Sequence, residues 1–388
     1  MTQNPWIVFA GGGTGGHLFP ALGVVEALRG RSLPVDVTFF CTTRPIDGEV
    51  LGRAGLEAVP QSVLPFTSKP WRWPAFLRQW RRSVTSCHRA FTARRPAVVV
   101  GAGGYASGPP VHAAMKLGIP TYLLNPDALP GRANRWLARR KDLSGIFAQW
   151  PVTKKHFSSS ARVIVAGCPV RPAFRALPDA HLDRHFGLVP ERKTLLITGA
   201  SQGARTINEA LIDLADQIAR TGWQVLHLSG TADRDRVEQA YARAAENCRP
   251  THFPYRVLAF SDLMAEAMVG ADLIVSRAGA SSLAEIQVVG KPSVLLPYPF
   301  HRDKHQWHNA AVLSEAGAAV LIDDTRDGRR NAELLGPILA DLMGDDNKRD
   351  GMSAAVRSLA YPESAERIAE YLLAEAKKPL SAPVRSPS

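Results

Sequence analysis

A glycine-rich run from Gly11 to Gly16 follows a short apolar segment, and His17 comes directly after it. Glycine loops let backbone N–H groups approach phosphate oxygens, and a helix that begins behind such a loop adds the partial positive charge of its N-terminus. The run is therefore typical of a site for a phosphorylated ligand. The same helix charge disfavours an imidazolium in the first turn, so we expect a neutral His17 that can act as a general base.

Two other interpretations of this run remain open. His17 can hydrogen-bond the glycine backbone without taking part in chemistry. The spacing also matches the G-x-G-x-x-G dinucleotide fingerprint loosely, with Asp36 or Glu26 as its acidic residue. A nicotinamide cofactor is the weaker interpretation, because His17 follows the glycines at once and no second dehydrogenase feature is present.

A second run, from Arg277 to Glu285, follows a predicted strand and opens a predicted helix. Free N–H groups at a helix start suit a diphosphate, and a carboxylate one turn inside can accept two hydrogen bonds from a ribose diol. Ordinary helix capping, with Ser281 as the N-cap and Glu285 in the first turn, gives the same pattern. The spacing alone leaves both interpretations open.

Metal chemistry has little support in the sequence. The one D-x-D motif, Asp233 to Asp235, is predicted to begin a helix, where acidic residues favour the helix dipole. The four cysteines are scattered without a C-x-x-C pair, which argues against a zinc site or a disulfide framework. We predict that each cysteine is a small buried residue, and that the protein binds neither a metal nor a cofactor.

An α/β fold must position these residues, because short β-branched runs alternate with helical patterns along the chain. In the first half we predict strands at Trp6–Ala10, Val35–Cys41, Ala97–Gly101, Thr121–Asn125, Gly145–Ala148 and Arg162–Ala166. In the second half we predict strands at Thr194–Thr198, Gln224–Leu228, Tyr255–Ala259, Leu273–Ser276, Ser293–Leu296 and Ala319–Ile322. Each half begins with a strand, a small-residue loop and a helix. We therefore predict two Rossmann-like domains with parallel sheets that face a central cleft.

The predicted domain boundaries follow from this repeat and from the positions of proline. We place the first domain at residues 1–167, a linker or hinge at 168–190 and the second domain at 191–358. A helix at 359–376 is predicted to pack back on the first domain, and the Pro- and Ser-rich tail 377–388 to be disordered. Neither a long apolar segment nor a signal peptide is apparent, so we expect a cytosolic protein.

A basic, aromatic segment dominates the charge pattern of the first half. The formal net charge is +12, and residues 58–126 contain nine Lys or Arg but no Asp or Glu. A basic amphipathic helix with tryptophan is typical of contact with an anionic membrane surface, and each basic residue contributes about 1 kcal/mol there. The predicted membrane contacts are Trp71, Trp73, Phe76, Leu77, Trp80 and Arg81. An apolar face that packs on the core is the alternative, and nucleic-acid binding is not expected because no recognition fold accompanies the segment.

Six ordered blocks of the chain resemble those of the MurG family of peptidoglycan glycosyltransferases (glycosyltransferase family 28, GT-B fold). The blocks are Gly12 to Pro20, Gly103 to Pro109, Gly167 to Arg171, Ser201 to Arg205, Arg277 to Glu285, and Asp303 to Gln306 with Asn309. The resemblance implies an inverting transfer of N-acetylglucosamine from UDP-N-acetylglucosamine to lipid I (undecaprenyl-pyrophosphoryl-MurNAc-pentapeptide), which forms lipid II. It also implies a peripheral protein at the cytoplasmic face of the bacterial inner membrane, with roles in cell-wall synthesis, cell shape and cell division.

The resemblance implies roles for individual residues. The donor UDP-N-acetylglucosamine is expected to contact Thr14, Gly15, Gly16, Asp127, Arg171, Ser201, Ser261, Ala280, Ser281, Ser282, Glu285, His305 and Gln306. The acceptor and its phosphates are expected to contact Gly103, Gly104, Tyr105 and Asn134. His17 is the expected catalytic residue, with Asp127 as its possible partner or as the base itself.

Two departures from the family pattern bear on these roles. The family usually shows two glutamines where this chain has His305 and Gln306. It also reads His-Glu-Gln-Asn where this chain has residues 124–127, so Asp127 replaces an asparagine. A carboxylate only accepts hydrogen bonds, whereas an amide also donates, so either the local contact has changed or Asp127 takes part in catalysis. Another GT-B transferase with a different acceptor, a UDP-GlcNAc 2-epimerase-like isomerase and a sugar-nucleotide sensor remain alternatives.

Overall fold

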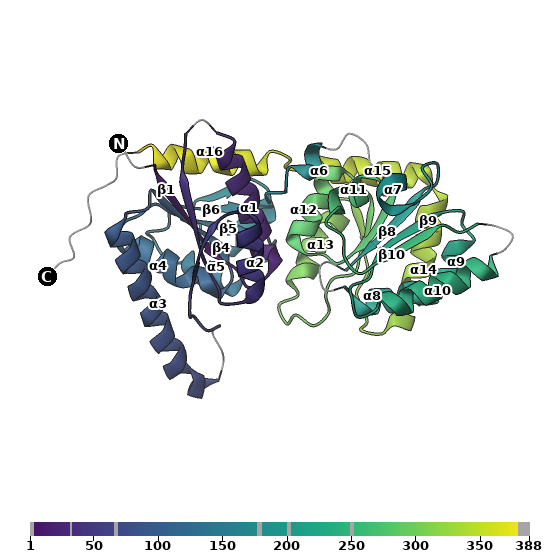
Figure 1. Ribbon diagram of the computed structural model, residues 1–388, viewed down its shortest axis with the longest axis horizontal. Helices are drawn as coiled ribbons and strands as arrows, with labels where there is room; N and C mark the ends of the chain where they lie inside the picture. Colours follow the sequence, from purple (N-terminus) through teal and green to yellow (C-terminus); the bar gives the residue numbers. More distant parts are fainter. Residues whose placement is uncertain are drawn as a thin grey trace. The chain divides into compact units, whose positions relative to one another are not determined.

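The computed structural model describes residues 4–31, 33–65, 69–176, 181–199, 203–248 and 252–378. The chain forms two compact units, one of Met1–Arg171 with Pro362–Ser388 and one of Pro172–Tyr361 (Figure 1). Each unit is built on one parallel sheet. None of the helices in the described residues is long and apolar enough to cross a membrane.

The first unit holds a seven-stranded sheet in the order β3-β2-β1-β4-β5-β6-β7. Its strands are β1 (Trp6–Gly11), β2 (Asp36–Cys41), β3 (Glu57–Pro60), β4 (Val98–Gly103), β5 (Thr121–Asn125), β6 (Gly145–Ala148) and β7 (Val163–Val165). Six of these were predicted, and β3 was missed. It is a short edge strand that begins with Glu57 and ends with Pro60, so it lacks the long apolar run of the central strands.

Helices cover both faces of this sheet. On one face, alternate β1 residues such as Ile7 and Phe9 pack against α1 (Gly15–Arg29) and α16 (Ser364–Ala376). On the other face, Val8 and its neighbours pack against α3 (Trp73–Ala93) and α4 (Gly108–Lys116). The remaining helices are α2 (Pro45–Arg53), α5 (Arg132–Leu137) and the 3-10 turns η1 (Pro70–Arg72), η2 (Tyr105–Ser107) and η3 (Pro151–His156).

Helix α16 follows the second unit in sequence but belongs to the first (Figure 1). Its apolar residues Ile368 and Leu372 are fully buried in the core on the α1 face. The Tyr122 hydroxyl donates a 2.9 Å hydrogen bond to the Glu375 carboxylate. Burial and this carboxylate raise the pKa of Tyr122 well above its usual value, so the hydroxyl keeps the proton that it donates.

The second unit holds a six-stranded sheet in the order β10-β9-β8-β11-β12-β13. Its strands are β8 (Thr194–Thr198), β9 (Gln224–Leu228), β10 (Tyr255–Leu258), β11 (Leu273–Ser276), β12 (Ser293–Leu295) and β13 (Ala319–Leu321). All six lie where the sequence predicts them, within one residue at their ends. Its helices are α8 (Arg205–Asp213), α9 (Ala215–Ala219), α10 (Arg234–Asn247), α11 (Met264–Val269), α12 (Ala280–Val289), α13 (His305–Glu315), α14 (Gly328–Gly344) and α15 (Asp346–Ser358).

The predicted linker at residues 168–190 contains two short helices, α6 (Ala173–Ala176) and α7 (Leu182–Phe186). Lys377 and Lys378 are the only residues of the predicted tail that lie within the described part of the chain. One cysteine prediction was wrong, because Cys248 is only partly buried whereas Cys41, Cys87 and Cys168 are buried. Cys248 directly follows α10, at the end of a helix that has one solvent-facing side.

Candidate active site

The glycine loop of the first unit lies at the point where its strand order changes direction. Strand β1 pairs with β2 on one side and with β4 on the other, so the loops that follow β1 and β4 are neighbours. A Cβ on Gly11 would lie 2.9 Å from the carbonyl oxygen of Gly103, which shows how closely the two loops approach. Ligands of parallel sheets bind at such a switch point, beyond the carboxyl ends of the strands.

His17 lies in the first turn of α1, against the backbone of the second loop. A Cβ on Gly103 would lie 2.8 Å from its Cδ2, and one on Gly104 would lie 3.2 Å from its Nδ1. Both glycines have positive φ angles, 105° and 74°. The ring therefore fits only because these two positions carry no side chain.

Two polar contacts of His17 involve Nδ1, which lies 3.1 Å from Thr14 Oγ1 and 3.3 Å from the Gly12 carbonyl oxygen. A carbonyl oxygen only accepts, so Nδ1 is the donor when it bonds Gly12. In that tautomer Nε2 carries the lone pair that a general base needs. The hydrogen bond between His17 and the glycine backbone, which the sequence left open, is thus present. It is compatible with the predicted catalytic role, because it leaves Nε2 as the basic nitrogen.

Asp47, which the sequence analysis did not single out, holds the glycine loop in place. Its carboxylate is fully buried and accepts hydrogen bonds from the Gly13 amide at 2.8 and 3.0 Å. The same carboxylate accepts the Thr42 amide at 2.9 Å and the Thr42 hydroxyl at 2.6 Å. A Cβ on Gly12 would lie 2.2 Å from Asp47 Oδ2, so Gly12 is required for this approach. The signal that could have found Asp47 is a carboxylate in a Pro-initiated helix directly after β2.

Asp127 lies in a turn after β5, and neighbouring side chains hydrogen-bond its backbone. The Asn125 side chain donates to the Asp127 carbonyl oxygen at 2.7 Å, and Thr153 Oγ1 lies 3.5 Å from the same oxygen. Asn134 is buried and donates to the Leu124 carbonyl and to Asn125 Oδ1, both at 3.0 Å. Asn134, a predicted acceptor contact, thus uses its amide hydrogens to hold the end of β5, while the Asp127 side chain is half-buried.

Two further predicted residues, Gly15 and Arg171, lie beside Phe19 near the start of α1. The Arg171 guanidinium lies 5.7 Å from the ring centroid of Phe19, which is 40% exposed. A Cβ on Gly15 would lie 2.7 Å from the same ring. Gly15, Phe19 and Arg171 therefore form one surface, where a cation lies beside a helix N-terminus. Tyr105, a predicted acceptor contact, is half-buried in η2 directly after Gly104.

The switch point of the second unit lies between β8 and β11, which pair in the middle of the sheet. Gly203, which precedes α8, lies close to the end of β9, since a Cβ on Gly203 would lie 2.2 Å from the Ser229 carbonyl oxygen. Ser201, a predicted donor contact, lies outside the described residues. The loop after β11 leads into α12, at the same edge of the sheet as the carboxyl end of β8.

The N-terminus of α12 differs from the ordinary capping that the sequence left open. Gly279, not Ser281, is the N-cap, and within the described chain no side chain caps this end. The first turn contains no acidic residue, so Glu285 lies beyond it and is half-buried. The Ser281 hydroxyl is buried without a hydrogen-bond partner among the described residues. These features leave backbone N–H groups and one hydroxyl available for an anion.

Gln306 and Asn309 hold α13 against this loop. Gln306 Oε1 accepts the Tyr298 amide at 2.9 Å and the Ala278 amide at 3.3 Å, and Asn309 donates to the Ala278 carbonyl at 3.3 Å. These two hydrogen bonds use Oε1 of Gln306 and not its NH2 group. Ser261, another predicted donor contact, accepts the Leu263 amide at 3.1 Å and so also shapes its own turn.

A buried ion pair supports the start of the same loop. The Arg277 guanidinium lies 2.5 Å from the Asp324 carboxylate, whose side chain has 0% exposure. Burial by itself raises the pKa of Asp324, but hydrogen bonds from Thr206, Asn331 and Arg277 outweigh it, so the pKa is lowered. Arg277 also donates to the Leu296 carbonyl at 2.9 Å. The pair joins β11, β12 and the segment after β13.

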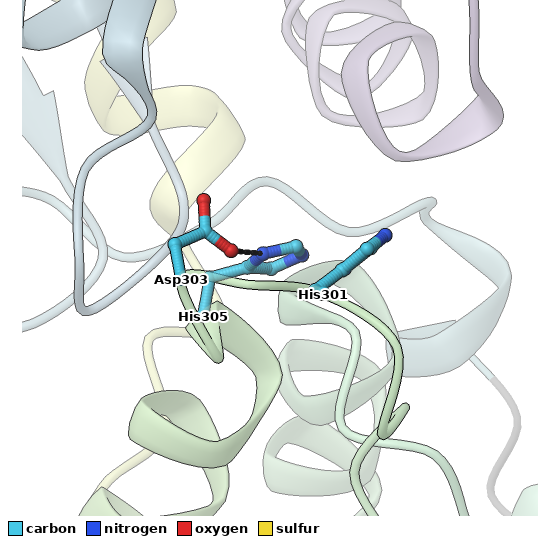
Figure 2. A group of neighbouring side chains, drawn as sticks. All are labelled: His301, Asp303 and His305. Carbon is cyan, nitrogen blue, oxygen red and sulfur yellow. Dashed lines mark hydrogen bonds and ion pairs between the residues drawn. The ribbon is translucent and has the colours of Figure 1, made fainter.

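His305 belongs to a cluster that the sequence analysis missed. Its Nδ1 lies 2.9 Å from Asp303 Oδ1, and its ring stacks on that of His301 with centroids 4.4 Å apart (Figure 2). The H-x-D-x-H spacing from 301 to 305 was the available signal.

The D-x-D motif at Asp233 to Asp235 lies at the start of a helix, because α10 begins directly after Asp233. The Asp233 carboxylate accepts hydrogen bonds from Asn208 and Arg236 at 2.9 and 3.0 Å.

The predicted membrane contacts lie in η1 and α3 and differ in exposure. The N-terminal turns of α3 project away from the sheet (Figure 1). Trp71, Trp73 and Leu77 are 73%, 45% and 49% exposed, and Arg81 is exposed as well. Trp80 is instead half-buried, and a Cβ on Gly108 of α4 would lie 2.7 Å from its ring. The apolar-face alternative therefore holds for Trp80, which packs on the protein, but not for the exposed group.

Comparison with protein families decides the class of this protein. Models of the glycosyltransferase family 28 N-terminal and C-terminal domains match residues 7–143 and 194–368. This chain belongs to glycosyltransferase family 28. The predicted family is thereby confirmed, as is the prediction of a glycosyltransferase.

Relatives of this family 28 glycosyltransferase match over nearly its whole length. It is 35% identical over 372 residues to the UDP-N-acetylglucosamine–N-acetylmuramyl-(pentapeptide) pyrophosphoryl-undecaprenol N-acetylglucosamine transferase of Desulforudis audaxviator, covering 94% of this chain and 97% of that protein. The crystal structure of Acinetobacter baumannii MurG matches with a TM-score of 0.75 and 25% identity, covering 95% and 99% of the two chains. The predicted GT-B fold is therefore confirmed.

A UDP-GlcNAc 2-epimerase from Neisseria meningitidis, solved with UDP-GlcNAc, has a similar fold. Its TM-score is 0.65 at 15% identity, covering 95% of this chain and 100% of that one. At this identity the likeness shows the fold alone.

Proposed function

We propose that this enzyme transfers N-acetylglucosamine from UDP-N-acetylglucosamine to the MurNAc 4-hydroxyl of lipid I, forming lipid II for peptidoglycan. The observation that carries this proposal is the match of both family 28 domains together with relatives of the same named activity over 94% of the chain. Two small-residue loops at the switch points of the two sheets support it, because each offers a helix N-terminus to a phosphate group.

The second unit is the proposed donor site. The uncapped N-terminus of α12, with the Ser281 hydroxyl, suits the diphosphate, and Glu285 suits the ribose hydroxyls. The NH2 group of Gln306 suits a hydroxyl of the sugar. As the bond to the sugar breaks, negative charge grows on the departing UDP, and the amide groups of α12 stabilise that charge.

The first unit is the proposed acceptor site, with His17 as the base. Nε2 of His17 takes the proton of the MurNAc 4-hydroxyl while the oxygen attacks the anomeric carbon and UDP leaves. A single displacement of this kind inverts the anomeric centre. Asp127 is proposed as the partner of His17 or as the base itself, and the second role requires its carboxylate rather than an amide.

The exposed face of α3 is the proposed contact with the cytoplasmic side of an anionic membrane. Trp71, Trp73 and Leu77 offer apolar area, and basic residues lie among them. Tryptophan suits the interface between headgroups and acyl chains, and the basic residues attract anionic lipids. Such a contact would keep the enzyme beside a lipid-linked acceptor.

The test is a metal-free assay with purified enzyme, UDP-N-acetylglucosamine and a short-chain lipid I analogue. We expect UDP release only with the acceptor, together with a β-1,4 disaccharide product. Asp127→Asn separates the two proposed roles, since full turnover in this variant would exclude Asp127 as a catalytic base. His17→Ala should lower kcat by about 10²- to 10⁴-fold if His17 is the base.

The same assay distinguishes the rival functions. Conversion of UDP-N-acetylglucosamine to its 2-epimer without acceptor would identify an isomerase. Donor binding without turnover on any lipid-linked acceptor would indicate a sensor. UDP release with another glycolipid, but not with the lipid I analogue, would mean that the altered residues 124–127 accompany a different acceptor.

A further inference from the structure

A cluster of three potential metal ligands lies at the start of α13, in a chain for which the sequence predicted no metal site. One ligand atom from each of His301, Asp303 and His305 lies within 4.8 Å of the others. Figure 2 shows the His305 ring between the Asp303 carboxylate and the His301 ring. The three residues alternate along five positions of the chain, so one short segment supplies the whole set.

The backbone brings these side chains together. Lys304, between Asp303 and His305, has a left-handed conformation with φ 47°, which is uncommon for a residue with a side chain. It is the N-cap of α13, so the chain turns sharply there, and His305 becomes the first residue of the helix. Tyr298 packs edge-on against the cluster, with its ring centroid 4.8 Å from that of His301.

We propose that His301, Asp303 and His305 bind one divalent cation of the zinc class. Two imidazoles and one carboxylate are the ligands that Zn²⁺, Co²⁺ and Ni²⁺ take, whereas Mg²⁺ and Ca²⁺ prefer oxygen ligands alone. A tetrahedral zinc ion with bonds of about 2.0–2.2 Å holds its ligand atoms about 3.4 Å apart. The cluster therefore needs to contract by less than about 1.5 Å. Rotation of the exposed His301 and Asp303 side chains can provide this change.

The hydrogen bond between Asp303 and His305 already holds two of the three ligands beside each other. The Asp303 carboxylate then binds the cation directly, and the His305 ring binds it through one of its two nitrogens. With either nitrogen, the cation cross-links the loop after β12 to the first turn of α13. Gln306 follows His305 in that turn and bonds the Tyr298 amide, so the cation adds a second link between the same two segments.

Calorimetric titration of the full-length enzyme, first treated with a chelator, tests the proposal directly. With ZnCl2 in a non-coordinating buffer we expect one bound ion per chain and a rise in the thermal unfolding temperature. With CoCl2 we expect the visible absorption of a Co²⁺ ion bound by nitrogen and oxygen ligands. Neither readout depends on turnover, so failure of the cation site leaves the proposed reaction untouched.

The matched variants are His301→Ala and His308→Ala. His308 is exposed on the same helix but lies outside the cluster, so His308→Ala should bind the ion as the original protein does. His301→Ala should weaken binding by at least about tenfold and lose the rise in unfolding temperature. No binding by the original protein, or equal loss in both variants, would overturn the proposal.

Discussion

Both oxygens of the Asp47 carboxylate accept the backbone N–H of Gly13, at 2.8 and 3.0 Å. This contact joins the first turn of α2 to the loop that leads into α1, where His17 lies. The Asp47 carboxylate is fully buried, so this contact fixes the backbone of the glycine loop from the protein interior. The loop is thus held in shape by the protein before any ligand binds.

Asp47→Asn should destabilise the protein and reduce turnover. The replacement turns an NH2 group toward backbone donors, and a buried donor left without an acceptor costs about 1–3 kcal/mol. Urea denaturation measures this loss. Asp36→Asn is the control, because the Asp36 side chain is 42% exposed in its pair with Arg94 and should cost less than about 1 kcal/mol. Equal losses in the two variants would contradict the anchoring role of Asp47.

Gly103→Ala should lower kcat by about tenfold or more, because the new Cβ would lie 2.8 Å from the His17 ring and displace it. A left-handed alanine also costs about 1–2 kcal/mol in stability. Gly55→Ala separates the two effects, since Gly55 has φ 63° but nothing within 4 Å of a new Cβ. We expect the control to lose stability while keeping its kcat. Normal kcat in Gly103→Ala would mean that the position of His17 is not critical.

Asp324→Asn should cost about 3–5 kcal/mol of stability, because it leaves the Arg277 guanidinium buried without its counter-ion. Urea denaturation followed by tryptophan fluorescence measures the change. Asp323→Asn is the matched control, since this neighbouring carboxylate is exposed and should change stability by no more than about 0.5 kcal/mol. A comparable effect at the two positions would show that the ion pair contributes little.

The contribution of Asp324 should depend on pH. Its pKa is lowered in the folded protein because its hydrogen bonds outweigh the effect of burial. The unfolded chain therefore binds the proton first, and the stabilisation is complete above the ordinary carboxyl pKa of about 4. As the pH falls below that value toward the lowered pKa, the difference in unfolding free energy between the original protein and Asp324→Asn should decrease. If this difference in unfolding free energy instead grows as the pH falls, the predicted pH dependence is wrong.

Replacing Trp71 and Trp73 together with serine should weaken binding to phosphatidylglycerol vesicles by about tenfold or more, since two exposed aromatic side chains are lost. Vesicle co-sedimentation measures the change, and added salt should weaken binding of the original protein. Phe260→Ser is the control, because Phe260 is 58% exposed but belongs to the second unit. Equal binding to neutral phosphatidylcholine vesicles would contradict an anionic preference.

The sequence by itself determined the α/β class, the two Rossmann-like halves and twelve of the strands. Parallel strands that are buried on both faces have nearly continuous apolar sequences, which a sequence pattern identifies directly. It also determined the family, since the ordered glycine, serine and arginine blocks depend on local backbone chemistry. The edge strand β3 was not predicted from the sequence. An edge strand needs no continuous apolar run, and the charged Glu57 and the proline at 60 are untypical of a strand.

Only the tertiary structure decided which residues work together. Strand order brings Gly103 beside His17, and packing brings Asp47 beneath Gly13 although 34 positions separate them. Packing also places Trp80 against α4, whereas Trp71 stays exposed. The tertiary structure further shows that no side chain caps the N-terminus of α12, where the sequence allowed Ser281 as the N-cap. The physical reason is that periodicity and propensity are properties of neighbours along the chain, whereas these contacts depend on the pairing of strands distant in sequence.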